Sequence, residues 1–120
     1  MSMSDGVEQL KREIVEALKA ERWEEALPKL EAWCDRFPDH LRSWLNRGYC
    51  LVRLQRYAEA VSVLDRCLDL EPSSMTAQGW RQKALEALDA ARVEIVAEVG
   101  PLIAQVLHQR HVGIARGGHG

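Results

Sequence analysis

The sequence predicts an all-α fold, an α-α superhelix of two helix–turn–helix repeats followed by C-terminal capping helices. The first observation is a repeat: the segment RWEEALPKLEAW, which begins at Arg22, returns as RYAEAVSVLDRC, which begins at Arg56, at an offset of 34 residues. The second is the spacing of apolar residues at three- and four-residue steps in each copy, which is the period of an amphipathic helix. Units of this length stack on their neighbours to bury a shared core.

Composition and charge are those of one small globular domain. The chain has 120 residues, of which 47% are apolar and 28% are charged, so it can bury one core but is too short for two domains. Its net charge of −2 gives no basic surface for nucleic acid or anionic lipid. The longest apolar region, VEIVAEVGPLIAQVL, is interrupted by charges and is too short to span a bilayer. We therefore expect neither a nucleic-acid nor a membrane partner.

The cysteines and the N-terminus indicate the compartment. Cys34, Cys50 and Cys67 are odd in number and form no CxxC pair. All three fall within helical patterns, so we expect small buried thiols rather than disulfides or metal ligands. The N-terminal segment MSMSDGVEQLKREI lacks the apolar core of a signal peptide. These features together predict a soluble protein of the cytoplasm.

The first repeat is expected over residues 7–40, after a flexible N-terminus at 1–6. Its first helix is VEQLKREIVEALKA, and the apolar stripe of that helix is Leu10, Ile14, Ala17 and Leu18. Its second helix, roughly 24–36, has an inner face made of Ala26, Leu27, Leu30 and Trp33. Pro28 lies close to the first turn, where a missing N–H does least harm, and Pro38 ends the helix.

The second repeat is expected over residues 41–74 and follows the same plan. Its helices are SWLNRGYCLVRL and YAEAVSVLDRCLDL, and Pro72 ends the second one. Gly48 and Ala60 are small residues at the point where these helices would cross, so no bulky side chain holds the axes apart. Because a glycine costs a helix about 1 kcal/mol, we expect Gly48 to have a packing role.

These positions resemble the tetratricopeptide repeat (TPR), a 34-residue helix–turn–helix unit with characteristic residues at fixed places. In the second repeat the matching residues are Trp44, Gly48, Tyr57, Ala60, Leu64, Cys67 and Pro72. In the first repeat they are Trp23, Ala26, Leu30 and Pro38. Leu10 and Ile14 stand there in place of Trp and Gly, and Trp33 fills a place that is usually small. The resemblance implies a right-handed TPR solenoid.

No complete third repeat follows. The segment after Pro72 is helical in pattern from a cap at Ser73 or Ser74 to about Val99, and it is expected to cover the open end of the second repeat. Gly100-Pro101 is expected to break or kink the chain, so that residues 75–111 form a capping helix and a C-terminal helix. Residues 112–120 are expected to be a disordered, Gly-rich tail.

The expected C-terminal helix has an apolar stripe that needs a partner, and it consists of Leu102, Ile103, Val106 and Leu107. The sequence is compatible with three partners for this stripe. The stripe can fold back on its own domain, pair with a second copy in a homodimer, or fill the groove until another protein displaces it.

Nothing in the sequence is typical of catalysis: it has no Gly-rich phosphate loop, nucleophile elbow or HExxH motif. We therefore expect no enzyme activity, no cofactor and no metal. His108, His111 and His119 gather near the C-terminus, and histidines at i and i+3 on a helix can share a metal. Without a thiol or carboxylate beside them, we interpret them as surface histidines.

In the TPR family the first helix of each repeat lines a concave groove that receives a peptide or helix of another protein. The resemblance implies a partner-binding groove at Lys11, Val15, Leu18, Arg42, Leu45, Asn46, Tyr49, Val52 and Arg53. Tyr49 would be an amphipathic anchor, and Lys11, Arg42 and Arg53 could hold carboxylates.

One use of the family is a clamp for the acidic C-terminus of heat-shock chaperones, built from two Lys, two Asn and an Arg. Lys11 and Asn46 match this set, but Val15, Thr76 and Trp80 stand where Asn, Lys and Arg would be. We therefore reject a co-chaperone clamp of this kind. The preferred interpretation is a small, non-catalytic TPR adaptor or chaperone-like module with a protein or peptide partner. The alternatives are a structural homo-oligomer assembled through the helices at 92–111, and a metal-handling or enzyme-accessory protein.

Overall fold

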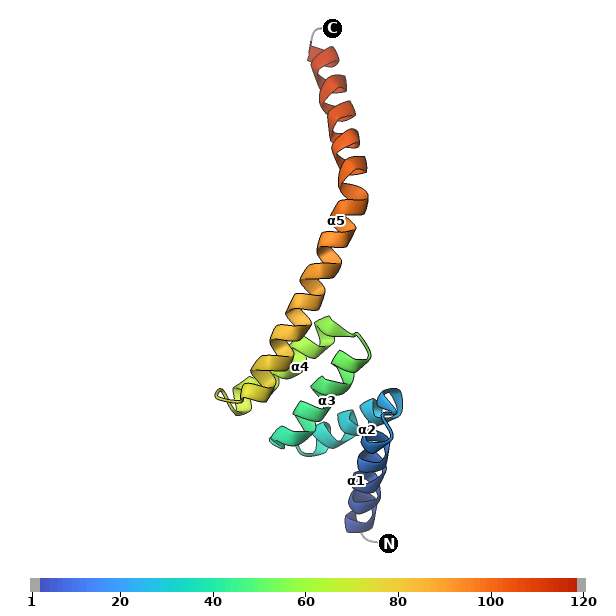
Figure 1. The fold of residues 1–120 in the computed structure, drawn as a ribbon, viewed down its shortest axis with the longest axis vertical. Helices are drawn as coiled ribbons and strands as arrows, with labels where there is room; N and C mark the ends of the chain where they lie inside the picture. Colours follow the sequence, from blue (N-terminus) through green and yellow to red (C-terminus); the bar gives the residue numbers. More distant parts are fainter. Residues whose placement is uncertain (1–2, 119–120) are drawn as a thin grey trace. The chain divides into compact units, whose positions relative to one another are not determined.

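The computed structural model describes residues 3–118, and the surroundings of the side chains of residues 6–109. Within that part of the chain all regular structure is helical. The helices are α1 (Met3–Lys19), α2 (Trp23–Arg36), α3 (Leu41–Arg53), α4 (Tyr57–Leu70) and α5 (Met75–Gly118), shown in Figure 1. The predicted all-α class is therefore confirmed.

The chain divides into two units, which we describe separately. The repeat unit is Met1–Ala87, and the C-terminal segment is Leu88–Gly120. In the repeat unit, α1 packs on α2, α2 on α3, and α3 on α4. The first turns of α5 belong to this unit as well, because Ala77 and Ala84 are fully buried in its core and Arg81 forms an ion pair with Asp65 of α4 at 2.6 Å. The C-terminal segment is the remainder of α5.

The 34-residue repeat is visible in the backbone itself. Glu21 and Gln55, which are 34 positions apart, both have a left-handed backbone, with φ of 58° and 60°. After Glu21, the N–H of Arg22 donates to the carbonyl of Ala17 at 2.9 Å; after Gln55, the N–H of Arg56 donates to Leu51 at 2.8 Å. This is the hydrogen bonding of a Schellman turn, which usually has glycine at the left-handed position. Both repeats therefore turn in the same way, each with a strained residue.

Replacing Glu21 with glycine is expected to stabilise the chain by about 0.5–1 kcal/mol, because glycine adopts a left-handed backbone without steric cost. Glu16→Gly is the matched control: Glu16 is an exposed residue inside α1, where the same replacement should destabilise by about 1 kcal/mol. Chemical denaturation of both variants measures the difference. Destabilisation of the two variants by equal amounts would contradict the turn assignment.

Prolines and one serine mark the helix ends. α2 ends at Arg36 and α4 at Leu70, each two residues before a predicted stop, Pro38 or Pro72. The carbonyl of Pro38 accepts a hydrogen bond at 2.9 Å from the indole N–H of Trp44. At the start of α5, the Ser74 hydroxyl oxygen accepts the backbone N–H of Ala77 at 3.2 Å, so the predicted serine cap lies at Ser74.

The core of the repeat unit contains the small and apolar positions that define the repeats. Its largest fully buried side chains are Leu30, Leu51, Leu64, Cys34, Cys50 and Cys67. The three thiols are free and buried, as predicted. Burial raises the pKa of Cys34, and it raises the pKa of Cys50 and of Cys67 to about 11. These thiols therefore stay protonated at neutral pH and fill space as small apolar groups.

Of the break or kink predicted at Gly100-Pro101, the break is wrong, because α5 continues through Pro101 to Gly118. Proline has a helical φ, so it costs the helix one hydrogen bond and about 3 kcal/mol without forcing an end. Gly100 eases the strain, since it lacks the Cβ that is one of the groups a following proline ring clashes with. A Gly-Pro pair therefore does not by itself end this helix.

Both ends of the chain are more helical than expected. α1 begins at Met3, within the segment predicted to be flexible, and α5 includes residues 112–118 of the predicted tail. Extending a formed helix fixes one residue for each new hydrogen bond, so a helix grows past weak positions once nucleated. Residues 1–2 and 119–120 lie outside the described residues.

Candidate functional site

A cavity of about 360 Å³ lies between α1, α2 and the start of α3. We call it the α1–α3 cavity, and its lining residues are Lys11, Ile14, Val15, Leu18, Leu30, Trp33, His40, Arg42, Ser43 and Asn46. The four residues from α1 are spaced by three and four positions, which places them on one helix face. The first helix of each repeat thus contributes to one concave site.

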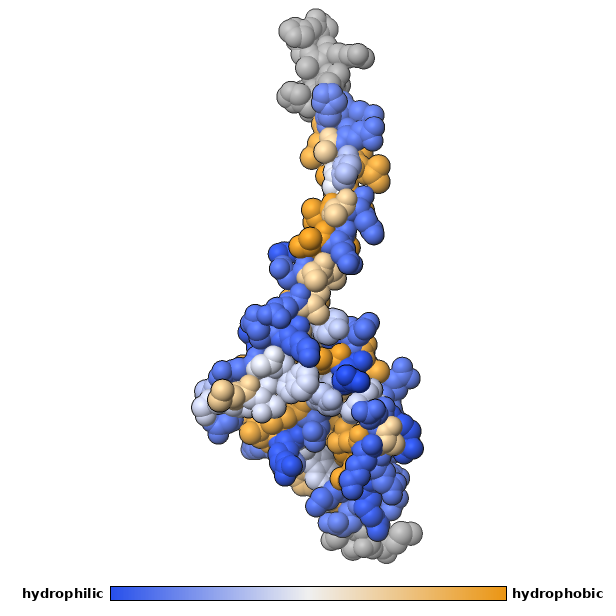
Figure 2. Space-filling view, in the orientation of Figure 1, coloured by the Kyte–Doolittle hydropathy of each residue, from blue (hydrophilic) through white to orange (hydrophobic). Residues whose placement is uncertain are grey.

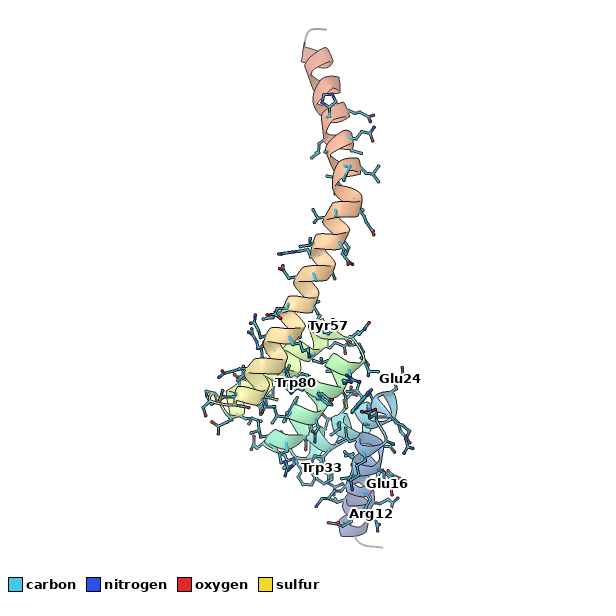
Figure 3. The ribbon with its side chains drawn as sticks, in the orientation of Figure 1. Arg12, Glu16, Glu24, Trp33, Tyr57 and Trp80 are labelled. Carbon is cyan, nitrogen blue, oxygen red and sulfur yellow. The ribbon has the colours of Figure 1, made fainter. Side chains whose placement is uncertain are left out.

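The inner wall of the cavity is apolar. Ile14 and Leu30 are almost completely buried, whereas Val15 remains 40% exposed at the opening. The Trp33 ring (labelled in Figure 3) packs against Phe37, with ring centroids 4.7 Å apart, and meets His40 edge-on at 6.2 Å. This bulky ring stands where the repeat usually has a small residue, and it fills one side of the cavity with aromatic surface suited to an apolar group.

The rim of the cavity is polar and positively charged. Lys11 and Arg42 are exposed, Asn46 is half-buried, and His40 shares a hydrogen bond with the buried hydroxyl of Ser43. No Asp or Glu is among the lining residues. Among the described residues, neither Lys11 nor Arg42 has a carboxylate within ion-pairing distance. Two cations and an amide above an apolar wall fit a carboxylate carried by an apolar segment.

Five of the nine predicted groove residues line this cavity, namely Lys11, Val15, Leu18, Arg42 and Asn46. The other four lie elsewhere. Leu45 is half-buried against the core, and Val52 belongs to the core at 7% exposure, so Val52 offers almost no surface to a partner. Arg53 lies with its guanidinium 5.6 Å from the centre of the Trp23 ring.

Tyr49 is the centre of a separate aromatic cluster. Its ring meets Trp23 of α2 edge-on at 5.2 Å and Trp80 of α5 at 4.7 Å. Figure 3 labels Trp80 on the first part of α5, which belongs to the repeat unit. Such edge contacts are worth about 0.5–1.5 kcal/mol each beyond the area they bury. This packing gives Tyr49 a stabilising role between three helices, whereas the sequence interpretation gave it a binding role.

The sequence interpretation did not include five lining residues, namely Ile14, Leu30, Trp33, His40 and Ser43. The sequence did contain a signal for Trp33, because this large residue stands at a repeat position that usually has a small one. The sequence contained no such signal for His40 and Ser43. Their hydrogen bond joins the α2–α3 connection to the first turn of α3.

Two features are missing from the residues that the structure describes, a metal-binding cluster and a membrane-spanning helix. In the part of the chain that the structure describes, no three His, Cys, Asp or Glu side chains gather closely enough to hold a metal ion. The side chains of His111 and His119, which belong to the metal-handling alternative, lie outside the described residues. Among the described residues no helix combines the length and the apolar character needed to cross a membrane.

Comparisons with known proteins agree with this architecture. A family model described as tetratricopeptide repeat matches residues 12–74. A similar solved structure is the complex of the TPR2B domain of yeast Sti1 with pHsp70, which is 26% identical with a TM-score of 0.57. The similarity covers 78% of this chain and 82% of that chain. A search of curated proteins found no match.

Proposed function

The chain belongs to the tetratricopeptide repeat family, and we propose that it is a non-catalytic adaptor that holds a segment of another protein in the α1–α3 cavity. The observation that carries the proposal is the chemistry of this cavity: apolar walls, two cations at the rim and no acidic lining residue. The segment bound there carries a carboxylate next to an apolar side chain. Acidic peptides and free C-termini have this chemistry.

Each part of the segment has a counterpart in the cavity. Lys11 on α1 and Arg42 on α3 lie at the rim and attract the carboxylate, and the Asn46 side chain can donate a hydrogen bond to it. The apolar side chain lies against Val15, Leu18 and the Trp33 ring. A hydrogen bond to a charged group contributes about 1.5–3 kcal/mol, less at an exposed rim, so the apolar contacts are needed for a stable complex.

The similar TPR2B domain supports a protein segment as the ligand class, because that domain is in a complex with pHsp70. The chaperone clamp of the family is incomplete in this chain, since Val15, Thr76 and Trp80 depart from it. Arg42 lines the cavity beside Asn46 and supplies a second cation near Lys11. We therefore propose carboxylate recognition by Lys11, Arg42 and Asn46, a set that differs from the clamp.

An array of acidic peptides, each made with a free C-terminal carboxylate and as the amide, tests this function. The wild-type chain is expected to bind a subset of the array, and the Lys11→Ala, Arg42→Ala double variant to bind the same peptides at least tenfold more weakly. A tenfold loss equals about 1.4 kcal/mol, which fits two partly exposed cations.

Arg12→Ala is the matched control for this experiment. Arg12 is an exposed cation next to Lys11 on α1 that is not part of the cavity lining, and it bonds to Gln9 of its own helix at 3.0 Å. Its removal changes the net charge without changing the site. Equal losses for Arg12→Ala and for either cavity cation would attribute binding to general charge and would contradict the proposed site.

A further inference from the structure

The C-terminal segment carries an apolar stripe that the proposed peptide site does not use. We call it the α5 stripe and define it as Ile95, Val96, Val99, Leu102, Ile103 and Val106. Five of these side chains are 54–61% exposed, and Val99 is 36% exposed. Their spacing of three and four residues keeps them on one face of the helix. Figure 2 shows orange, apolar side chains along this upper part of α5.

The apolar area of the stripe is large enough that burial against another surface is expected. Burying a Val, Leu or Ile side chain removes on the order of 100 Å² of apolar surface, so the exposed part of the stripe amounts to roughly 350 Å². Patches of about 300–600 Å² on a monomer are often functional. Two copies of the stripe together bury roughly 700 Å² before the flanking side chains are added, which is the size of a weak, reversible association rather than of a permanent dimer.

The first half of the C-terminal segment is acidic and its second half is basic. A partner helix fits best when its own charges run in the opposite order. Residues 88–98 contain Asp89, Glu94 and Glu98 against the single cation Arg92. Residues 99–120 contain no Asp or Glu, and two arginines. A second copy that runs antiparallel places its basic half beside the acidic half of the first. A parallel copy would align like charges.

Four of the six stripe residues are also self-complementary about the middle of the stripe. Val99 and Leu102 lie at equal distances from the Gly100-Pro101 bond, and so do Ile95 and Val106. A two-fold symmetric interface requires this, because each residue i that contacts j must also be contacted as j by i. We propose that two copies of this chain pair antiparallel through the α5 stripe, with the two-fold axis near Gly100-Pro101.

Solution mass across a concentration series of the full chain tests the association. The wild-type chain is expected to shift from monomer to dimer mass as concentration rises, and the Leu102→Glu, Ile103→Glu variant to remain monomeric. Ala97→Glu is the control: Ala97 is exposed and lies on the opposite side of the helix from the stripe, so this variant should dimerise like the wild type. Glutamate is a good helix former, and circular dichroism checks that helix content is kept. A wild-type chain that stays monomeric, or a stripe variant that still dimerises, would overturn the proposal.

Cross-linking tests the orientation. Leu88 and Leu102 lie on the same face of α5, and the native thiols are buried, so Leu88→Cys and Leu102→Cys each add one reactive site. In the antiparallel pair the two copies of residue 102 lie near the axis, whereas the copies of residue 88 are about 37 Å apart along the helices at 1.5 Å per residue. A short bis-maleimide should therefore link Leu102→Cys and leave Leu88→Cys unlinked. Efficient linking of both variants would mean parallel pairing and would contradict the proposed arrangement.

Discussion

Replacement of Gly48 by leucine is expected to destabilise the chain by about 3 kcal/mol, the upper part of the range for overpacked sites. For a folded unit of this size, that loss lowers the Tm by about 12–24 °C. A Cβ at position 48 would lie 2.7 Å from Cδ2 and 2.9 Å from Cγ of Leu64. Leu64 is fully buried, so its side chain has no free space to enter, and α3 and α4 must separate. Thermal unfolding followed by circular dichroism measures the loss.

Alanine at two glycines gives the matched control. Gly79 lies in α5 with nothing within 4 Å of an added Cβ. Gly79→Ala should therefore stabilise by up to about 1 kcal/mol, the difference in helix propensity. Gly48→Ala has the same gain but introduces the clash with Leu64, so it should destabilise. Stabilisation by both alanine variants would show that α3 and α4 do not approach closely at Gly48.

Removal of the Tyr49 ring is expected to cost about 2–3 kcal/mol in Tyr49→Ala, less than a fully buried aromatic because Tyr49 is half-buried. The ring contacts Trp23 and Trp80, so its loss opens a gap between α2, α3 and the first turns of α5. Urea denaturation gives the free energy of unfolding. Tryptophan fluorescence in the same experiment follows the four indole rings of the chain, among them the two that contact Tyr49.

Tyr49→Phe is the control for that substitution, because it keeps both ring contacts and should leave the free energy of unfolding within about 0.5 kcal/mol. If Tyr49→Ala keeps its stability but loses peptide binding, Tyr49 is the exposed anchor that the TPR resemblance implied. Full stability without a loss of binding would contradict both roles.

Much of the repeat unit could be predicted from the sequence because its signals are local. The pattern YAEAVSVLDRCLDL coincides with α4, Tyr57–Leu70, since an aromatic residue follows the turn and Pro72 follows the end. The packing role expected for Gly48 also agrees with the structure, because the close contact with Leu64 explains a residue that helix propensity disfavours. Each of these features is fixed by a few neighbouring residues.

The helical course of α5 and half of the candidate site could not be predicted in the same way. Whether Pro101 ends a helix or is carried within it depends on the stability of the turns on both sides, which a single residue does not report. In the site, Lys11, Val15 and Leu18 were implied by the resemblance to the TPR, whose groove positions lie on one face of the first helix. Trp33 and His40 reach the cavity only because α2 and the α2–α3 connection close one side of it, which depends on tertiary packing.

Binding of a protein segment in the α1–α3 cavity can be located residue by residue in solution. Backbone amide shifts of the full chain are recorded by NMR while the tightest acidic peptide of the array is added. If the peptide binds in the cavity, the shift changes gather at residues 11–18 and 40–46, where α1 and the start of α3 line the cavity. Changes confined to the Tyr49 cluster or to residues 88–109 would contradict binding in the cavity and would move the binding site to another surface.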